Sequence, residues 1–173
     1  AALANQGLFL PAGSGGRDAT QDKMRSALSC DPIDRERNVG IWDAFVALWE
    51  RLDLVRQQLA KELGRDLLPE MEISYVCYPP GGYYQRHVDE CTDESTVDDG
   101  PTKRSVSFVF FLSEDGWARQ DGGELRTYAR KDDSFEDDLD LVPEPGALAL
   151  FDSCMEHEVL PTKRERLVLV GWW

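Results

Sequence analysis

The chain contains only two histidines among its 173 residues, and both stand beside carboxylates. His87 and Asp89 are separated by one residue in the segment YYQRHVDE, and His157 lies far downstream in MEHEVLP. Residues i and i+2 of an extended segment point to the same side, so His87 and Asp89 can reach one metal ion. Two histidines and a carboxylate with open positions are typical of non-haem Fe(II) oxygenases, and zinc hydrolases use the same ligand types. These residues predict a metal site.

A cation could complete this site. Arg166 begins the last apolar segment, RLVLVGWW, and a strand would place four residues on one face: Arg166, Val168, Val170 and Trp172. If that face lines a barrel interior, the buried guanidinium needs an anionic partner, and a small dianionic ligand would fit because arginine binds carboxylates through two parallel hydrogen bonds. The alternative is that Arg166 is an exposed charge of KRER (163–166).

The elements that must position these residues follow from the apolar pattern. Apolar residues recur at three- and four-residue steps over 42–63, which predicts a helix ended by Gly64. Short apolar or alternating segments predict strands at 71–78, 105–112, 122–128, 146–151 and 166–173. A helix followed by several short strands predicts an α+β barrel or sandwich with helices packed against it.

Composition limits the function further. The net charge of −14 argues against nucleic acid as a partner, and no apolar run reaches the roughly 18 residues of a membrane span. Two acidic stretches, 89–99 and 131–140, are either solvated loops or a rim for a basic partner. The four cysteines form no CxxC pair, which favours free thiols in a reducing compartment. We expect a cytoplasmic monomer. The first residues lack an initiator Met, so we expect a trimmed or processed N-terminus, from which a targeting segment could be missing.

Several segments together resemble the Fe(II)/2-oxoglutarate-dependent dioxygenases, in particular the prolyl 4-hydroxylase branch that includes the oxygen-sensing enzymes. The matching segments are CYPPGGYYQRHVD (77–89), SVSFVFFL (105–112), GGELR (122–126), PEPGALALFDS (143–153) and HEVLPTKRERLVLVGWW (157–173). The resemblance implies a double-stranded β-helix, or jelly-roll, barrel with N-terminal supporting helices. It further implies one catalytic domain over 1–173, divided into a finger-loop and supporting region (1–40), a supporting helix (41–64) and the jelly-roll core (71–173).

The resemblance also implies roles for the site residues. His87, Asp89 and His157 would bind Fe(II) as the catalytic centre, and Arg166 with Tyr78 would hold the distal carboxylate of 2-oxoglutarate. O2 would be the second cosubstrate, and ascorbate is a candidate reductant. The implied reaction hydroxylates a C–H bond, foremost that of a prolyl residue in a protein or peptide, and releases succinate and CO2.

Two positions depart from the oxygen-sensing enzymes. Phe111 stands where they have a second tyrosine, and Val170 stands where they have a threonine. Both changes remove a hydroxyl near the cosubstrate, so Arg166 would carry more of its binding. Three alternatives remain open: an oxygenase acting on a small molecule, a non-catalytic jelly-roll that binds a small acid or a partner protein, and a zinc hydrolase. The hydrolase would need a general base beside the metal.

Overall fold

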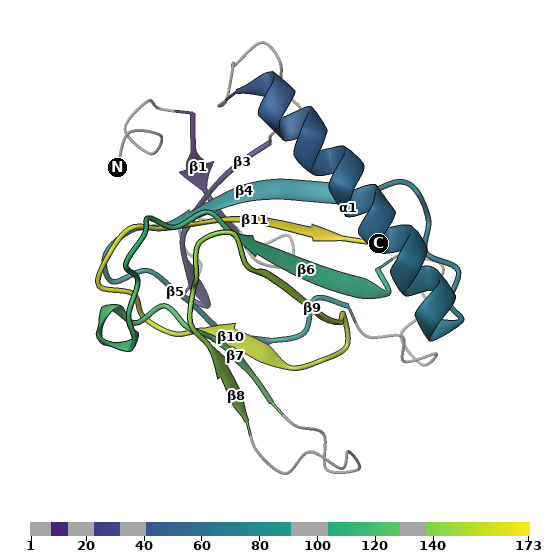
Figure 1. Ribbon diagram of the computed structural model, residues 1–173. Coiled ribbons are helices and arrows are strands. Elements are labelled where there is room, and N and C mark those ends of the chain that lie inside the picture. The colour runs from purple at the N-terminus through teal and green to yellow at the C-terminus, as the bar shows by residue number, and fades with distance from the viewer. Residues whose placement is uncertain (1–7, 14–22, 32–40, 91–103, 129–137) are drawn as a thin grey trace.

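The computed structural model describes residues 8–13, 23–31, 41–90, 104–128 and 138–173. Within them, two antiparallel sheets face each other as a double-stranded β-helix, and helix α1 (Trp42–Leu63) lies across the outer face of the larger sheet (Figure 1). The predicted jelly-roll barrel with helical support is confirmed, with a single α-helix in the described part of the chain. Most of the predicted finger loop (11–22) and of the acidic stretches lies outside the described residues.

The larger sheet has six strands in the order β1-β3-β4-β11-β6-β9. They are Leu10–Pro11 (β1), Leu28–Cys30 (β3), Glu72–Tyr78 (β4), Arg166–Trp172 (β11), Val106–Phe111 (β6) and Leu148–Asp152 (β9). The smaller sheet has five strands in the order β2-β5-β10-β7-β8. They are Arg25–Ser26 (β2), Tyr83–His87 (β5), His157–Val159 (β10), Leu125–Thr127 (β7) and Leu139–Leu141 (β8).

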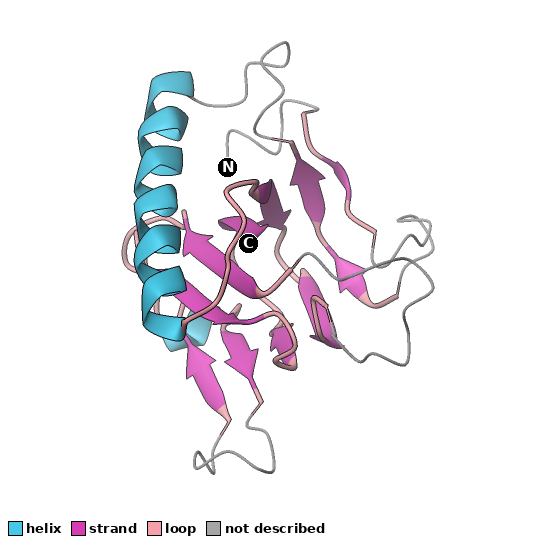
Figure 2. Ribbon diagram, turned by 90° about the vertical axis from the view of Figure 1, so that its right-hand side faces the viewer, coloured by secondary structure: helices cyan, strands magenta, loops and turns pink. Residues whose placement is uncertain are grey.

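Helix α1 has the bounds that the apolar periodicity predicts. Gly64 adopts a left-handed conformation with φ of 62° and donates its backbone N–H to the Ala60 carbonyl, which ends the helix. The apolar side of the helix packs on the larger sheet, where Leu52 meets Leu169 and Trp173 in one buried cluster. Figure 2 shows the helix on one side of the strands, with its outer side facing away from them. No helix among the described residues combines the length and the apolar character needed to cross a membrane.

The packing of α1 gives a stability test. Leu52 is 2% exposed, so Leu52→Ala removes buried methyl groups and leaves a cavity, which costs about 2–5 kcal/mol of unfolding free energy. Leu54→Ala is the matched control, since Leu54 is 65% exposed and a surface change of this kind alters stability by about 0.5 kcal/mol or less. Urea unfolding followed by far-UV circular dichroism measures both. Equal midpoints for the two variants would contradict the helix packing.

Strand β11 explains how a cation reaches the barrel interior. The strand lies between β4 and β6, and both of its faces are covered. Leu169 points toward the helix, whereas Val168 packs inside the barrel. Arg166, Val170 and Trp172 line the cavity between the sheets, so the shared face predicted from the period-two pattern is present.

Candidate active site

Strand pairing brings the two histidines together. His87 ends β5, His157 begins β10, and the two residues are direct partners in the antiparallel ladder. Asp89 follows two residues after β5, where its backbone N–H donates to the Ser153 carbonyl at 3.1 Å. The candidate ligand atoms of the three side chains all lie within 4.8 Å of one another. The three residues predicted from the sequence therefore form one cluster that could hold a metal ion.

Hydrogen bonds set the orientation of this cluster. Nδ1 of His87 lies 2.7 Å from the Gln85 carbonyl, and Nδ1 of His157 lies 2.9 Å from the Met155 carbonyl. Because a carbonyl only accepts, each Nδ1 carries the proton, and each Nε2 presents a lone pair. These Nε2 atoms face Asp89, at 3.6 Å for His87 and 3.7 Å for His157.

The protonation states suit metal ligation. Burial opposes ionisation of Asp89, but the neighbouring His87 and His157 side chains and the hydrogen bond from Ser107 outweigh it, so the pKa of Asp89 lies well below its usual value. Burial also lowers the pKa of His157 below that of a free imidazole. At neutral pH the cluster thus offers an ionised carboxylate beside a neutral imidazole, the forms that bind metal.

Ser107 is a supporting residue that the sequence reasoning does not predict. Its hydroxyl donates to Asp89 Oδ2 at 2.7 Å and lies 3.0 Å from the Ser153 hydroxyl. The signal was available, because a serine inside the apolar strand SVSFVFFL is a buried polar group that needs a partner. The contact holds Oδ2, the carboxylate oxygen that also faces His157 Nε2.

The cluster opens into a cavity of about 340 Å³ between the two sheets. All five residues predicted for the site line it: His87, Asp89, His157, Arg166 and Tyr78. Apolar side chains supply much of the remaining wall: Phe108, Val109, Leu125, Phe151, Val159 and Val170. A mostly apolar pocket with a few convergent polar groups is the usual form of a small-ligand site.

Arg166 lies inside this cavity and is not an exposed member of KRER. It is 1% exposed, and its Nε and Nη2 atoms are buried without a hydrogen-bond partner among the described residues. The guanidinium carbon lies 5.0 Å from the Tyr78 ring centre and 5.3 Å from the Phe111 ring centre. Burial lowers the pKa of Arg166 to about 10, so the group is still a cation at neutral pH. A buried cation in this state calls for an anionic ligand.

The described residues that line the cavity include no carboxylate that could serve as a general base beside the metal, as the hydrolase alternative requires. Among the described residues that line it, Asp89 is the sole carboxylate. Glu158, the neighbour of His157, accepts a hydrogen bond from the Tyr128 hydroxyl and is not part of the cavity wall. Glu90 lies 3.9 Å from Arg104 and is likewise absent from the wall.

Comparison with known proteins identifies the family. The family model described as the 2OG-Fe(II) oxygenase superfamily matches residues 73–173, the part of the chain that holds the whole cluster and Arg166. The chain belongs to the 2OG-Fe(II) oxygenase superfamily. Membership implies Fe(II) and 2-oxoglutarate, and the charges and donor atoms of the cavity fit both.

Solved structures similar to this oxygenase include prolyl hydroxylases. A Pseudomonas putida prolyl-4-hydroxylase is 32% identical, with a TM-score of 0.72, and the match covers 98% of this chain and 77% of that one. A Trichoplax adhaerens prolyl hydroxylase, solved with a hypoxia inducible factor oxygen degradation domain peptide fragment, is 25% identical, with a TM-score of 0.78 and coverage of 98% and 72%. A prolyl 4-hydroxylase structure from Phytophthora capsici is 27% identical, with a TM-score of 0.62 and coverage of 84% and 46%.

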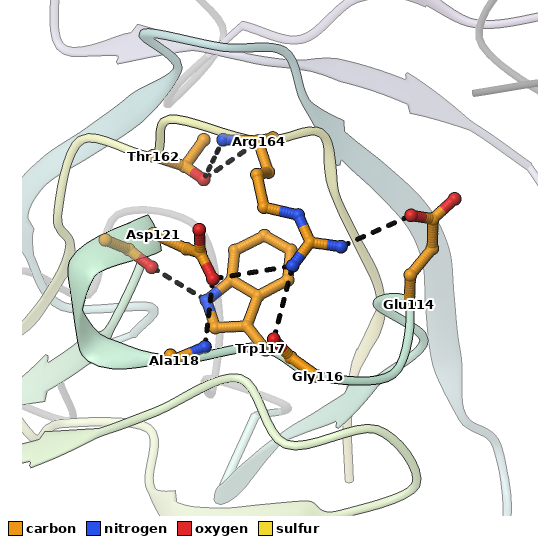
Figure 3. Close-up of polar contacts among 8 residues, drawn as sticks. Glu114, Gly116, Trp117, Ala118, Asp121, Thr162 and Arg164 are labelled. Carbon is orange, nitrogen blue, oxygen red and sulfur yellow. Dashed lines mark hydrogen bonds and ion pairs between the residues drawn. The ribbon is translucent and has the colours of Figure 1, made fainter.

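A polar cluster around Trp117 and Arg164 lies beside the turn that leads into β11 (Figure 3). The Arg164 guanidinium lies over the Trp117 ring at 5.0 Å and reaches Asp121 at 3.4 Å and Glu114 at 3.3 Å. Trp117 Nε1 donates to the Gly122 carbonyl at 2.9 Å. These contacts join the loop before β7 to the turn that leads into β11, immediately ahead of Arg166.

Gly123 follows Gly122 of this polar cluster and lies directly against the Arg166 side chain. The glycine has φ of 74°, and a Cβ placed on it would lie 3.1 Å from Arg166 Cδ and 3.1 Å from Thr162 Oγ1. That approach is too close for an alanine unless a neighbour moves. The absence of a side chain at Gly123 therefore helps to set the position of the Arg166 side chain.

Proposed function

We propose that this oxygenase hydroxylates prolyl residues in a protein or peptide, with conversion of 2-oxoglutarate to succinate and CO2. The observation that carries the oxygenase chemistry is that one cavity holds the His87–Asp89–His157 cluster and the buried Arg166 guanidinium, whose Nε and Nη2 have no hydrogen-bond partner among the described residues. The choice of a prolyl substrate is supported by the similarity to prolyl hydroxylases at 25% to 32% identity.

In this proposal His87, Asp89 and His157 hold the metal through two Nε2 atoms and one carboxylate oxygen. Asp89 offsets part of the metal charge, and three protein ligands leave positions for the cosubstrates. Bound Fe(II), together with 2-oxoglutarate and O2, would supply the oxidising chemistry that breaks the substrate C–H bond. The chain's own tasks are to orient the reactants and, through the apolar wall, to exclude water.

Arg166 and Tyr78 would hold the distal carboxylate of 2-oxoglutarate. They are direct partners on the adjacent strands β11 and β4, and both are buried. Phe111 lies against the guanidinium and Val170 lies on the cavity wall, and neither offers a hydroxyl. The charge-assisted bonds from Arg166 would therefore supply most of the polar binding energy for the cosubstrate.

Gly123→Ala tests the position of Arg166. We expect the apparent Kd for 2-oxoglutarate to rise about tenfold, because the new methyl group displaces a side chain that must meet a carboxylate with good geometry. Gly116→Ala is the matched control, since Gly116 has a similar φ of 72° but nothing within 4 Å of an added Cβ. Fe(II) binding should be unchanged in both variants. An equal loss of cosubstrate affinity in the two variants would show that backbone strain, and not displacement of Arg166, causes the loss. Unchanged affinity in both variants would contradict a role of Gly123 in positioning Arg166.

The proposed function is tested first without O2. Fe(II) and then 2-oxoglutarate are added to the metal-free protein, and the metal-to-ligand charge-transfer band of the cosubstrate complex is followed in the visible range. O2 and proline-containing peptides are then supplied, and hydroxyproline and succinate are measured by mass spectrometry. A band with hydroxyproline supports the proposal. A band with no hydroxylated peptide would favour a small-molecule substrate, and the absence of a band despite bound metal would favour a binding module.

A further inference from the structure

A second arginine, Arg25, enters the cavity from the edge of the smaller sheet. It lies on β2, where it is the direct partner of Tyr84 on β5. The Met24 carbonyl accepts the Gln85 N–H at 2.8 Å, and the Lys23 carbonyl accepts the Tyr83 hydroxyl at 3.0 Å. These bonds fix the backbone of β2 against the strand that ends in His87.

The Arg25 side chain is half-buried and lines the cavity. Its guanidinium carbon lies 4.7 Å from the centre of the Tyr84 ring, and the same ring stacks on the His87 imidazole at 3.6 Å. Arg25 is thus separated from a candidate metal ligand by one aromatic side chain. Any group that it binds in the cavity lies close to the reacting atoms.

Arg25 lacks a counter-charge in the described part of the chain. Its Nε is buried with no hydrogen-bond partner there, and no described carboxylate lies within ion-pair distance of the guanidinium. The contrast with Arg104, another cavity-lining arginine, is informative. Arg104 Nε lies 3.1 Å from a Glu72 carboxylate oxygen and 3.9 Å from Glu90, so its charge is already neutralised.

Among the described residues that line the cavity, the charges of the loaded site leave Arg25 as the surplus cation. In the proposed function the charges of Fe(II), Asp89, the 2-oxoglutarate dianion and Arg166 cancel. Arg104 is balanced by Glu72 and Glu90. A half-buried guanidinium that has no counter-charge among the described residues and lies next to an apolar wall selects an anionic group, because a carboxylate accepts charge-assisted hydrogen bonds that a neutral group makes more weakly.

We propose that Arg25 is a specificity-determining residue that binds a carboxylate of the primary substrate, next to the residue that is hydroxylated. The inference rests on the proposed function, which supplies the other charges of the site. The carboxylate comes either from an aspartate or glutamate side chain beside the target proline, or from the α-carboxylate at a chain end. The protein's net charge of −14 repels acid-rich peptides, so recognition is of a single, local carboxylate.

The test uses the protein loaded with Fe(II) and 2-oxoglutarate without O2, and a labelled host peptide with one proline in a neutral context. One series carries a single Asp beside the proline, on either side, and is matched with Asn. A second series ends at the proline, with a free carboxylate or an amide. Fluorescence anisotropy gives the peptide Kd, and admission of O2 then gives hydroxyproline by mass spectrometry.

Four proteins are compared: wild type, Arg25→Gln, Arg25→Lys and Arg51→Gln. The last makes the same change in net charge at an exposed position of helix α1. We expect wild type and Arg51→Gln to bind the carboxylate peptide roughly tenfold more tightly than its neutral match, the effect of one charge-assisted hydrogen bond. Arg25→Gln should remove this preference, and Arg25→Lys should keep part of it. The series that shows the preference identifies the source of the carboxylate.

The outcomes separate this inference from the proposed function. If Arg25→Gln weakens Asp and Asn peptides equally, Arg25 contacts a neutral group, and the inference fails. A rise in the Kd for 2-oxoglutarate, with peptide preference intact, would assign Arg25 to the cosubstrate and also overturns it. Hydroxylation of every peptide without preference refutes the inference alone. A preference without hydroxyproline supports Arg25 but refutes prolyl hydroxylation, and failure of all peptides to bind refutes both.

Discussion

Asp89→Ala is expected to abolish 2-oxoglutarate turnover, with succinate formation reduced by more than about a hundredfold. The Asp89 carboxylate is the one anionic member of the cluster and lies 3.6 Å and 3.7 Å from the two histidine Nε2 atoms. Its removal leaves two neutral imidazoles, which cannot offset the charge of a divalent ion. Ser107 would also lose its carboxylate acceptor and keep only its contact with the Ser153 hydroxyl. Fe(II) affinity should fall together with activity.

The measurement is isothermal titration with Fe(II) without O2, followed by succinate analysis. Asp152→Ala is the control. Asp152 ends strand β9, five residues before His157 in the sequence, and is not part of the cavity wall. Its carboxylate pairs with Arg65 at 2.7 Å, and both side chains are 41% exposed. Loss of such an exposed pair costs about 1 kcal/mol or less and leaves metal binding intact. Near-normal succinate formation in Asp89→Ala would rule out Asp89 as a ligand.

The sequence predicts best those parts of the fold that rest on local periodicity. Helix α1 is predicted to the residue, because its apolar stripe and Gly64 are local signals. The i, i+2 spacing of His87 and Asp89 is local as well. By contrast, β1, β2, β3 and β8 have two or three residues each and are too short to show a period, so the sequence does not reveal them.

Long-range pairing decides the rest of the site. Arg25 precedes Tyr84 by a long stretch of chain, and nothing in either segment indicates that they are partners. The same holds for Gly123 and Arg166, because a loop and a side chain that are distant in the sequence approach each other closely. Neutralisation of Arg104 by Glu72 also depends on two segments that are far apart in the sequence. A charge count along the chain therefore cannot tell which cavity arginine is free to bind a ligand.

Arg166→Ala is expected to raise the apparent Kd for 2-oxoglutarate about a hundredfold while Fe(II) binding stays near normal. Truncating one partner of a buried, hydrogen-bonded charge pair costs about 2–5 kcal/mol, and a hundredfold loss lies within that range. Arg166→Lys keeps the charge but not the two-pronged geometry, so its affinity should be intermediate. Arg65→Ala serves as the control, because Arg65 is exposed and pairs with Asp152.

Thermal unfolding separates ligand binding from folding in this variant. Without cosubstrate, Arg166 is a buried cation with two nitrogens that have no hydrogen-bond partner in the described part of the chain, so its removal should not lower the Tm and should relieve a desolvation cost. With Fe(II) and saturating 2-oxoglutarate, the Tm of wild type should rise through mass action, and that of Arg166→Ala should rise much less. A Tm loss without ligand would instead make Arg166 a structural residue. An unchanged 2-oxoglutarate affinity would assign the buried guanidinium to a different anion, and the cosubstrate site would then need another cation in the cavity.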